Sequence, residues 1–170
     1  MKFEISEFEQ NIDSEFNKIW DYCKTDSNKE WTIAIKTILE KINQNFFHNK
    51  IATSNLQNTE SGEWLFDFVI YEENKENYLN KLNLIAEIEW RNYNEYFPQL
   101  KYDFEKLLIA KCNYKLFIFE VDDNDELVDH TSKLSKILSN YNENNIFAEN
   151  EKYYLIIWNR KDQIFKIEKL

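Results

Sequence analysis

The chain contains a single glycine, Gly62, and a single proline, Pro98, among its 170 residues. Folds that bind phosphates on a glycine-rich loop need several glycines within a few residues, because only glycine lets the backbone approach the phosphate closely. The composition therefore excludes a Walker loop, a dinucleotide-binding fingerprint and a collagen-like repeat. Hydrophobic residues make up 43% of the chain and aromatic residues 16%, which suffices for a buried core. We therefore expect one domain spanning residues 1–170.

Charge limits the kinds of partner that this domain can bind. The chain has 21 basic and 31 acidic residues, which gives a net charge of −10. Because neutralisation of phosphates by Lys and Arg drives sequence-independent binding to nucleic acids, the acidic total excludes a broad basic footprint. Segments 60–90 and 120–150 each contain 2 basic and 8 acidic residues. The second segment indicates a surface suited to a basic protein partner.

The N-terminus and the two cysteines predict a cytoplasmic protein. The first ten residues, MKFEISEFEQ, lack the apolar stretch of a secretion signal, and no segment is long and apolar enough to predict a membrane span. Cys23 and Cys112 have no CxxC partner, so we expect two free thiols in a reducing compartment.

Hydrophobic periodicity predicts an α/β domain with a mixed central sheet flanked by helices. Apolar residues at three- and four-residue steps predict helices over residues 4–24, 27–47, 94–111 and from about 127 to 141. β-branched and aromatic runs predict strands over residues 50–55, 63–72, 82–90, 114–121, 153–159 and 163–167. The second and third of these strands are expected to form a hairpin through residues 73–81.

Three acidic residues interrupt the apolar strands. Asp67 lies inside WLFDFVI, and Glu87 and Glu89 lie inside LIAEIEW. Alternation along a strand directs Glu87 and Glu89 to the same face, and the hairpin allows Asp67 to join them. Carboxylates that share a face repel one another unless a cation or a proton neutralises them, and Mg²⁺ is an oxygen-binding cation that suits such a group. The alternative is a sheet with one solvated face, on which acidic residues are ordinary.

At these residues the sequence resembles the PD-(D/E)XK nuclease superfamily. Asp67, Glu87 and Glu89 match its three motif positions, and the predicted order of helix, strand, hairpin, helix and strand over about residues 28–121 resembles its restriction-endonuclease-like core. Helix 4–24 and segment 124–170 would then be additions to that core. The segments AEIEW and YDFEKLL are also similar to those of small bacterial nuclease-like proteins. Glu89 departs from the usual motif lysine, although BamHI-type restriction endonucleases carry Glu there.

The resemblance implies a hydrolase that cleaves DNA with Mg²⁺ or Mn²⁺, in restriction or phage defence. It implies that Asp67, Glu87, Glu89 and the carbonyl group of Ile88 bind the metal and that Glu89 acts as a base or a ligand. Arg91 and Lys106 are the candidate cations near the transition state. Lys106 lies roughly 180° from Phe97 on a helical wheel, so a solvated lysine is the alternative.

A second function stays open beside the nuclease. The domain can be a catalytically inactive relative, such as an immunity or regulatory protein that binds a basic partner. Three other features are expected to be structural: Asp103 as a helix-packing or capping residue, the DDNDE segment at 122–126 as a turn that begins a helix, and His48 and His130 as surface or capping residues.

Overall fold

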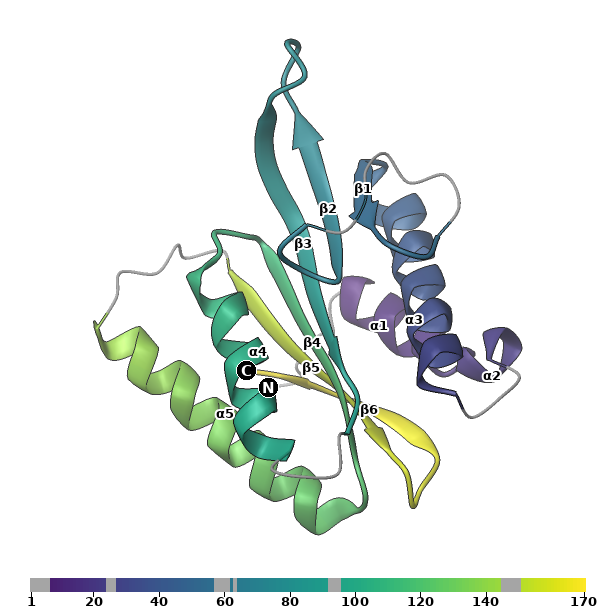
Figure 1. Ribbon diagram of the computed structural model, residues 1–170, viewed down its shortest axis with the longest axis vertical. Coiled ribbons are helices and arrows are strands. Elements are labelled where there is room, and N and C mark those ends of the chain that lie inside the picture. The colour runs from purple at the N-terminus through teal and green to yellow at the C-terminus, as the bar shows by residue number, and fades with distance from the viewer. Residues whose placement is uncertain (1–6, 24–26, 57–61, 63, 92–95, 145–150) are drawn as a thin grey trace.

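A six-stranded mixed sheet forms the centre of the protein in the computed structural model, which describes residues 7–23, 27–56, 62, 64–91, 96–144 and 151–170. The strands are β1 (Lys50–Thr53), β2 (Phe68–Glu73), β3 (Leu79–Glu89), β4 (Tyr114–Val121), β5 (Lys152–Asn159) and β6 (Ile164–Lys169). They lie in the sheet in the same order as in the chain. The β3–β4 and β4–β5 pairs are parallel, and the other pairs are antiparallel. The predicted α/β fold with a mixed sheet is therefore confirmed (Figure 1).

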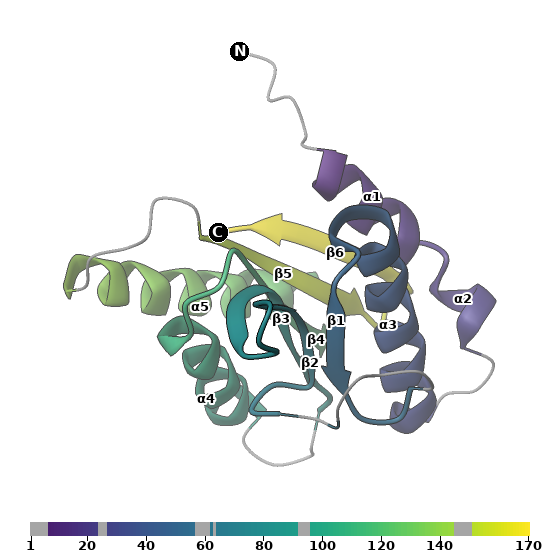
Figure 2. The same ribbon diagram turned by 90° about the horizontal axis from the view of Figure 1, so that it is seen from above.

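Helices cover both faces of the sheet. The N-terminal helices are α1 (Glu7–Phe16), α2 (Ile19–Tyr22) and α3 (Asn28–Ile42), and a π-helical turn, η1 (Asn43–Phe47), extends the last of them. The other two helices are α4 (Tyr96–Ile109) and α5 (Asn124–Asn144), which connect the parallel strands. Seen from above, α1–α3 lie on one side of the sheet, and α4 and α5 lie on the other (Figure 2). None of the helices among the described residues combines the length and the apolar character needed to cross a membrane.

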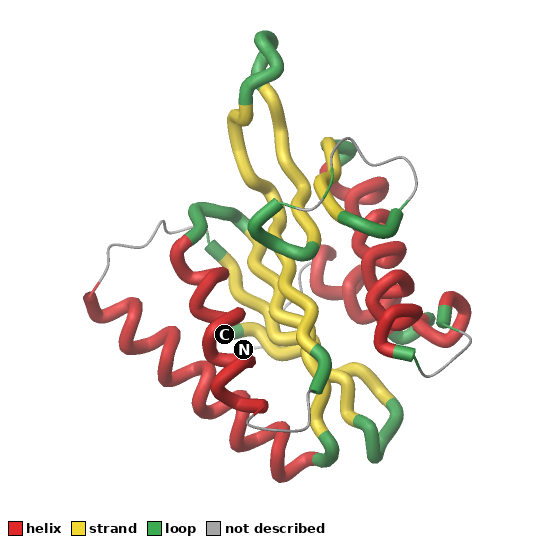
Figure 3. The backbone as a smooth tube through the Cα atoms, viewed as in Figure 1, coloured by secondary structure: helices red, strands yellow, loops and turns green. Residues whose placement is uncertain are grey.

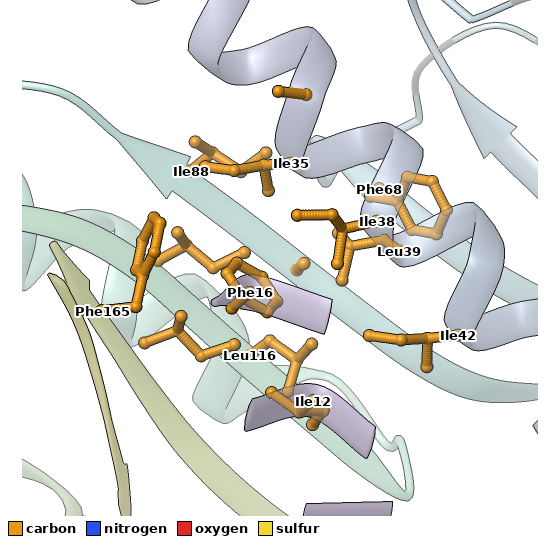
Figure 4. Packing of buried hydrophobic residues seen from close by; sticks show 14 of the residues in the cluster. Ile12, Phe16, Ile35, Ile38, Leu39, Ile42, Phe68, Ile88, Leu116 and Phe165 are labelled. Atoms are coloured by element: carbon orange, nitrogen blue, oxygen red, sulfur yellow. The ribbon is translucent and has the colours of Figure 1, made fainter. Parts of the chain in front are cut away.

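Alternation along the strands builds a separate hydrophobic core on each face. The N-terminal face packs buried residues of α1 and α3 against the inward side chains of the sheet, among them Phe16, Ile35, Ile38, Phe68, Ile88 and Leu116 (Figure 4). The opposite face packs α4 and α5 onto residues that include Val69, Ile85, Phe117, Phe119 and Leu155. The central strand β4 has buried side chains on both faces, which explains its nearly continuous apolar sequence.

The local signals that predicted the helices match contacts in the structure. The Ser27 hydroxyl accepts the Glu30 backbone N–H at 3.3 Å and caps α3. Asp123 accepts the backbone N–H groups of Asp125 and Glu126 at 3.0 and 3.1 Å, so the DDNDE segment begins α5 as expected. Pro98 lies in the first turn of α4, where a missing N–H costs nothing. His48 has φ 53° and ends η1 in the left-handed conformation.

Two predicted elements differ from the structure. The first helix, expected over residues 4–24, is divided into α1 and α2 by a turn at Asn17–Lys18, and residues 4–6 and 24 lie outside the described part. The strand expected over residues 63–72 begins only at Phe68, because the chain bends at Leu65–Asp67 before it enters the sheet. Residues 94 and 95 of the helix predicted over 94–111 also lie outside the described part.

Candidate functional site

Glu87 and Glu89 project from the end of β3 toward α4. Leu84, Ala86 and Ile88 pack into the core of the α1–α3 face, whereas Ile85 packs into the core on the α4 face. Since residues two apart share a face, both glutamates lie on the α4 side, and the prediction that they share a face is confirmed. Glu87 is buried, with 4% of its surface exposed, and Glu89 is half-buried.

Asp67 lies one residue before β2 instead of in the middle of a strand. Its Oδ2 accepts the backbone N–H of Ile88 at 2.8 Å, and its carbonyl group accepts the Thr53 hydroxyl at 2.6 Å. The Asp67 side chain thus accepts a hydrogen bond from a β3 amide that a backbone carbonyl of the neighbouring strand would otherwise accept. Regular pairing between β2 and β3 begins at the next residue, Phe68. The expectation of a strand-interior Asp67 is wrong, but the bend holds its carboxylate beside the motif strand.

Lys106 reaches the same place from α4. Its Nζ lies 2.8 Å from Oε1 of Glu87 and 3.4 Å from Oδ1 of Asp103. Only 22% of the Lys106 side chain is exposed, so the alternative of a solvated lysine is wrong. Helical steps of three and four residues bring Gln99, Asp103 and Lys106 onto one stripe of α4.

Asp103 joins the group that the sequence assigned to Asp67, Glu87 and Glu89. It is buried, its Oδ2 accepts Gln99 Nε2 at 2.7 Å, and it contacts the carboxyl group of Glu89. The sequence placed Asp103 among the packing residues because it lies at the margin of the apolar stripe of α4. The three-residue spacing to Lys106 was the signal that could have found it. We call Asp67, Glu87, Glu89, Asp103 and Lys106 the carboxylate cluster.

Glu87 and Glu89 hold protons unusually tightly. Burial raises the pKa of Glu87 to about 8, against the lowering effect of Lys106 and with a further rise from the charge of Asp67. Burial also raises the pKa of Glu89 to about 7, helped by its contact with Asp103 and by the charge of Asp67. Burial lowers the pKa of Lys106, but its contacts with Glu87 and Asp103 outweigh this effect and raise it overall. The single ammonium group of Lys106 therefore does not offset the effect of burial on Glu87 and Glu89.

The donor atoms of the cluster suit a hard divalent cation, because Mg²⁺ prefers carboxylate oxygens and water. The under-compensated charge around Glu87 and Glu89 also favours a cation. In the present arrangement, however, no three His, Cys, Asp or Glu side chains of the described residues are grouped to hold a metal ion together. A cation at Glu87 would therefore share this carboxylate with Lys106 or displace its ammonium group.

Arg91, the other candidate cation, has its contacts elsewhere. Its guanidinium group pairs with Asp122 and lies 2.6 Å from Oε1 of Glu126. The ring of Tyr96 lies beneath it, 5.3 Å away. The backbone N–H of Arg91 donates to Glu120 at 2.9 Å. These contacts tie the end of β3 to the start of α5 and not to the carboxylate cluster.

His130 is a residue whose environment the sequence did not predict. It was expected to be a surface or capping residue, but it is buried beside the rings of Tyr96, Phe97 and Phe119. Burial lowers the pKa of His130, although Glu126 and Asp129 act in the opposite direction. Apolar residues at 127, 134 and 138 on the same side of the helix were the signal for this buried position.

The aromatic residues of β5 and the two cysteines lie in the core. Tyr153, Tyr154 and Trp158 are buried core residues of β5, as expected from aromatic residues in a strand. Cys23 and Cys112 are buried free thiols.

With its geometry established, the chain was compared with known proteins. No family model, no curated protein and no solved structure matches it.

Proposed function

We propose that this protein is a metal-dependent nuclease that hydrolyses phosphodiester bonds in DNA at the carboxylate cluster. The observation that supports the proposal is the convergence of Asp67, Glu87 and Lys106 from three different elements. Asp67 and Glu87 were selected in the sequence by their resemblance to a nuclease motif; the β2–β3 register, which pairs Phe68 with Ala86, brings them side by side, and α4 adds Lys106. A restriction-endonuclease-like core also agrees with the order α3, β1, β2, β3, α4, β4 and with the parallel β3–β4 pair.

Lys106 supplies the positive charge that the motif strand lacks. Glu89 stands where the superfamily motif has lysine, and α4 brings the ammonium group of Lys106 to within 2.8 Å of Glu87 instead. A positive charge fixed at this place stabilises the charge that develops on a phosphoryl group during hydrolysis. The raised pKa of Lys106 keeps the side chain protonated for this role.

Asp67 and Glu87 would bind the metal, together with the backbone carbonyl of Ile88. When bound, Mg²⁺ polarises a phosphoryl oxygen and lowers the pKa of a coordinated water. Glu89, whose pKa is about 7, is suited to accept and release a proton near neutral pH. Asp103 orients this group through its contact with Glu89 and anchors Lys106 at 3.4 Å.

The alternative is an interaction module with the same fold and no catalysis. One observation favours it: the ammonium group of Lys106 already neutralises part of Glu87, so the cluster is partly stable without a metal. Asp122, Asp125 and Asp129 are exposed on and before α5 and would suit a basic partner.

A cleavage assay separates the two functions. Supercoiled plasmid and single-stranded circular DNA are incubated with the full chain and either Mg²⁺, Mn²⁺ or EDTA. The nuclease proposal expects metal-dependent cleavage that Glu87→Gln reduces by about a hundredfold or more. Glu76→Gln, at an exposed glutamate of the β2–β3 turn, is the matched control and should cleave like the wild type. Cleavage that persists in Glu87→Gln would show that the carboxylate cluster is not the catalytic site.

A second readout tests the metal directly. Binding to the folded state alone raises its stability, by about 2.7 kcal/mol at a ligand concentration one hundred times the dissociation constant. Mg²⁺ should therefore raise the melting temperature of the wild type and of Glu76→Gln. Equal stabilisation of Glu87→Gln would mean that the metal binds elsewhere.

A further inference from the structure

Exposed apolar side chains gather on the two segments that flank the carboxylate cluster. Among the described residues, the exposed large apolar side chains include Trp64 and Leu65 on the segment before β2, and Tyr102 and Ile109 on α4. Leu65 lies two residues before Asp67. Tyr102 and Ile109 lie four residues before and three residues after Lys106, so they share its side of the helix.

The two segments lie on the same face of the sheet. Phe66 belongs to the same buried core as Leu100, Phe104 and Leu107 of α4. Figure 3 shows the green segment before β2 crossing in front of the sheet, on the side of α4. Residues of this segment and of α4 therefore border the carboxylate cluster from two directions.

The aromatic rings at this border are accessible. Tyr102 is 64% exposed and Trp64 is 41% exposed. The Trp64 ring packs on that of Tyr71, with centroids 4.5 Å apart, which fixes its position while one side stays exposed. Tyr102 lies one turn from Lys106 on α4.

The cationic groups on the same two segments are few. Lys101 and Lys106 are the lysines of α4, residues 64–67 carry none, and neither segment carries an arginine. Lys101 pairs with Glu105 at 3.7 Å, and Lys106 pairs with Glu87. Duplex DNA exposes its phosphates and hides the faces of its bases, so binding to it relies on several phosphate contacts that this border cannot supply. Unpaired bases expose their faces, and each base that stacks on an aromatic side chain adds binding free energy to whatever phosphate contacts are made.

We infer that the carboxylate cluster takes single-stranded nucleic acid as its substrate, with unpaired bases stacking on Tyr102 and Trp64. This inference rests on the proposed function and names the substrate class of that site. In such a complex, Tyr102 holds a base one turn from Lys106 and Trp64 holds a base farther along the sheet, where its ring packs on Tyr71, while the backbone between these bases passes Lys106 and the carboxylates. Duplex DNA would present only its charged backbone to an acidic protein and would bind weakly.

Fluorescence anisotropy in EDTA tests this inference without cleavage. The probes are a fluorescein-labelled oligothymidylate and the same strand annealed to oligoadenylate, and the protein is the full chain. We expect the single strand to bind at least about tenfold more tightly than the duplex. Binding that is equal for the two probes, tighter for the duplex, or undetectable for both would overturn the inference.

Variants at Tyr102 separate base stacking from general apolar contact. Because the side chain is largely exposed, its replacement should leave the fold intact. Tyr102→Phe keeps the ring and should bind like the wild type, whereas Tyr102→Leu should bind the single strand about five- to tenfold more weakly. Tyr78→Leu, at a tyrosine of similar exposure in the β2–β3 turn, is the control and should not change binding. Equal binding by Tyr102→Leu and the wild type would overturn the assignment.

The salt dependence provides a second, independent readout. With one or two phosphate contacts, the logarithm of the association constant should fall with the logarithm of salt concentration with a slope of about −0.7 to −1.4. A slope several times steeper would mean that phosphate contacts dominate, which contradicts stacking. Single-strand binding in EDTA without cleavage in Mg²⁺ would refute the proposed nuclease function and leave the binding inference standing.

Discussion

Nζ of Lys106 lies 2.8 Å from Oε1 of Glu87, although the lysine belongs to α4 and the glutamate to β3. The pair couples the helix to the motif strand at the place where the carboxylates gather. Burial nevertheless raises the pKa of Glu87 to about 8 in spite of the adjacent ammonium group. The ammonium group of Lys106 therefore does not fully stabilise the ionised form of Glu87, and a further positive charge at this end of the sheet would be favourable.

Replacement of Lys106 by methionine should reduce the rate of DNA cleavage by about a hundredfold or more, because a positioned charge that faces the transition state is lost. Lys106→Arg keeps the charge with a different shape and should retain more activity. Lys101→Met is the matched control, since Lys101 is an exposed lysine of the same helix. Single-turnover cleavage of single-stranded circular DNA measures the effect. Equal rates for Lys106→Met and Lys101→Met would exclude Lys106 from catalysis.

Stability in EDTA should fall as the pH rises from about 5 to about 8. The pKa of Glu87 is about 8 in the folded protein against an ordinary value of 4.5, so the folded state binds this proton more tightly than the unfolded state. The contribution of Glu87 is complete below its unfolded pKa and is lost as the pH rises through its folded pKa, at a cost of roughly 2–4 kcal/mol. Glu89 acts in the same direction.

Urea unfolding at several pH values checks this prediction. Glu87→Gln cannot titrate, so its stability should depend much less on pH over the same range. Glu76→Gln should follow the wild-type profile. A wild-type profile that is flat from about pH 5 to about pH 8 would contradict the raised pKa.

Lys115→Met should destabilise the protein by about 2–4 kcal/mol, because it removes the cation of a buried group and leaves the carboxylate of Glu151 without its counter-charge. Nζ of Lys115 lies 2.7 Å from Oε2 of Glu151 and 2.7 Å from the Tyr153 hydroxyl, and the lysine side chain is fully buried. The double variant Lys115→Met/Glu151→Gln should recover at least half of the loss, as measured by urea unfolding. A double variant as unstable as Lys115→Met would show that packing, not the unpaired charge, sets the cost.

Arg91→Gln should lower the melting temperature and leave the cleavage rate within about threefold of the wild type. The reason is that the guanidinium group pairs with Asp122 and Glu126 rather than with the carboxylate cluster. Circular dichroism gives the melting temperature, and single-turnover cleavage well below it gives the rate. A hundredfold loss of rate in a folded Arg91→Gln protein would show that Arg91 takes part in catalysis at the carboxylate cluster.

Most of the fold could be predicted from local patterns in the chain. β4 lies where its apolar run predicted it, over residues 114–121, and the Ser27 cap begins α3 as expected. The bend at Asp67 could not be predicted, because an aspartate flanked by Leu65, Phe66 and Phe68 has the alternation of a strand. Its bond to the Ile88 amide is a tertiary contact between segments that the sequence pattern treats separately.

The sequence identified Asp67, Glu87, Glu89 and Lys106 as candidates for the site, but it missed Asp103 and could not show how α4 meets β3. Glu87 and Glu89 share a face because of the two-residue period of β3. Lys106 and Asp103 reach them only through the position of α4 on the sheet, which depends on core packing by residues such as Leu100 and Phe104. A helical wheel describes one helix alone, so it left a solvated Lys106 open as the alternative although the sheet extends beneath it.

The identical order of the strands in the chain and in the sheet has a consequence for how this protein folds. Each strand emerging from the ribosome pairs with the strand made just before it, so the sheet can grow in the direction of synthesis. Every member of the carboxylate cluster lies between residues 67 and 106, ahead of β4, β5 and β6. We expect the segment that contains the acidic residues and Lys106 to be synthesised and folded first. The later strands β4, β5 and β6 then add to it without rearranging it.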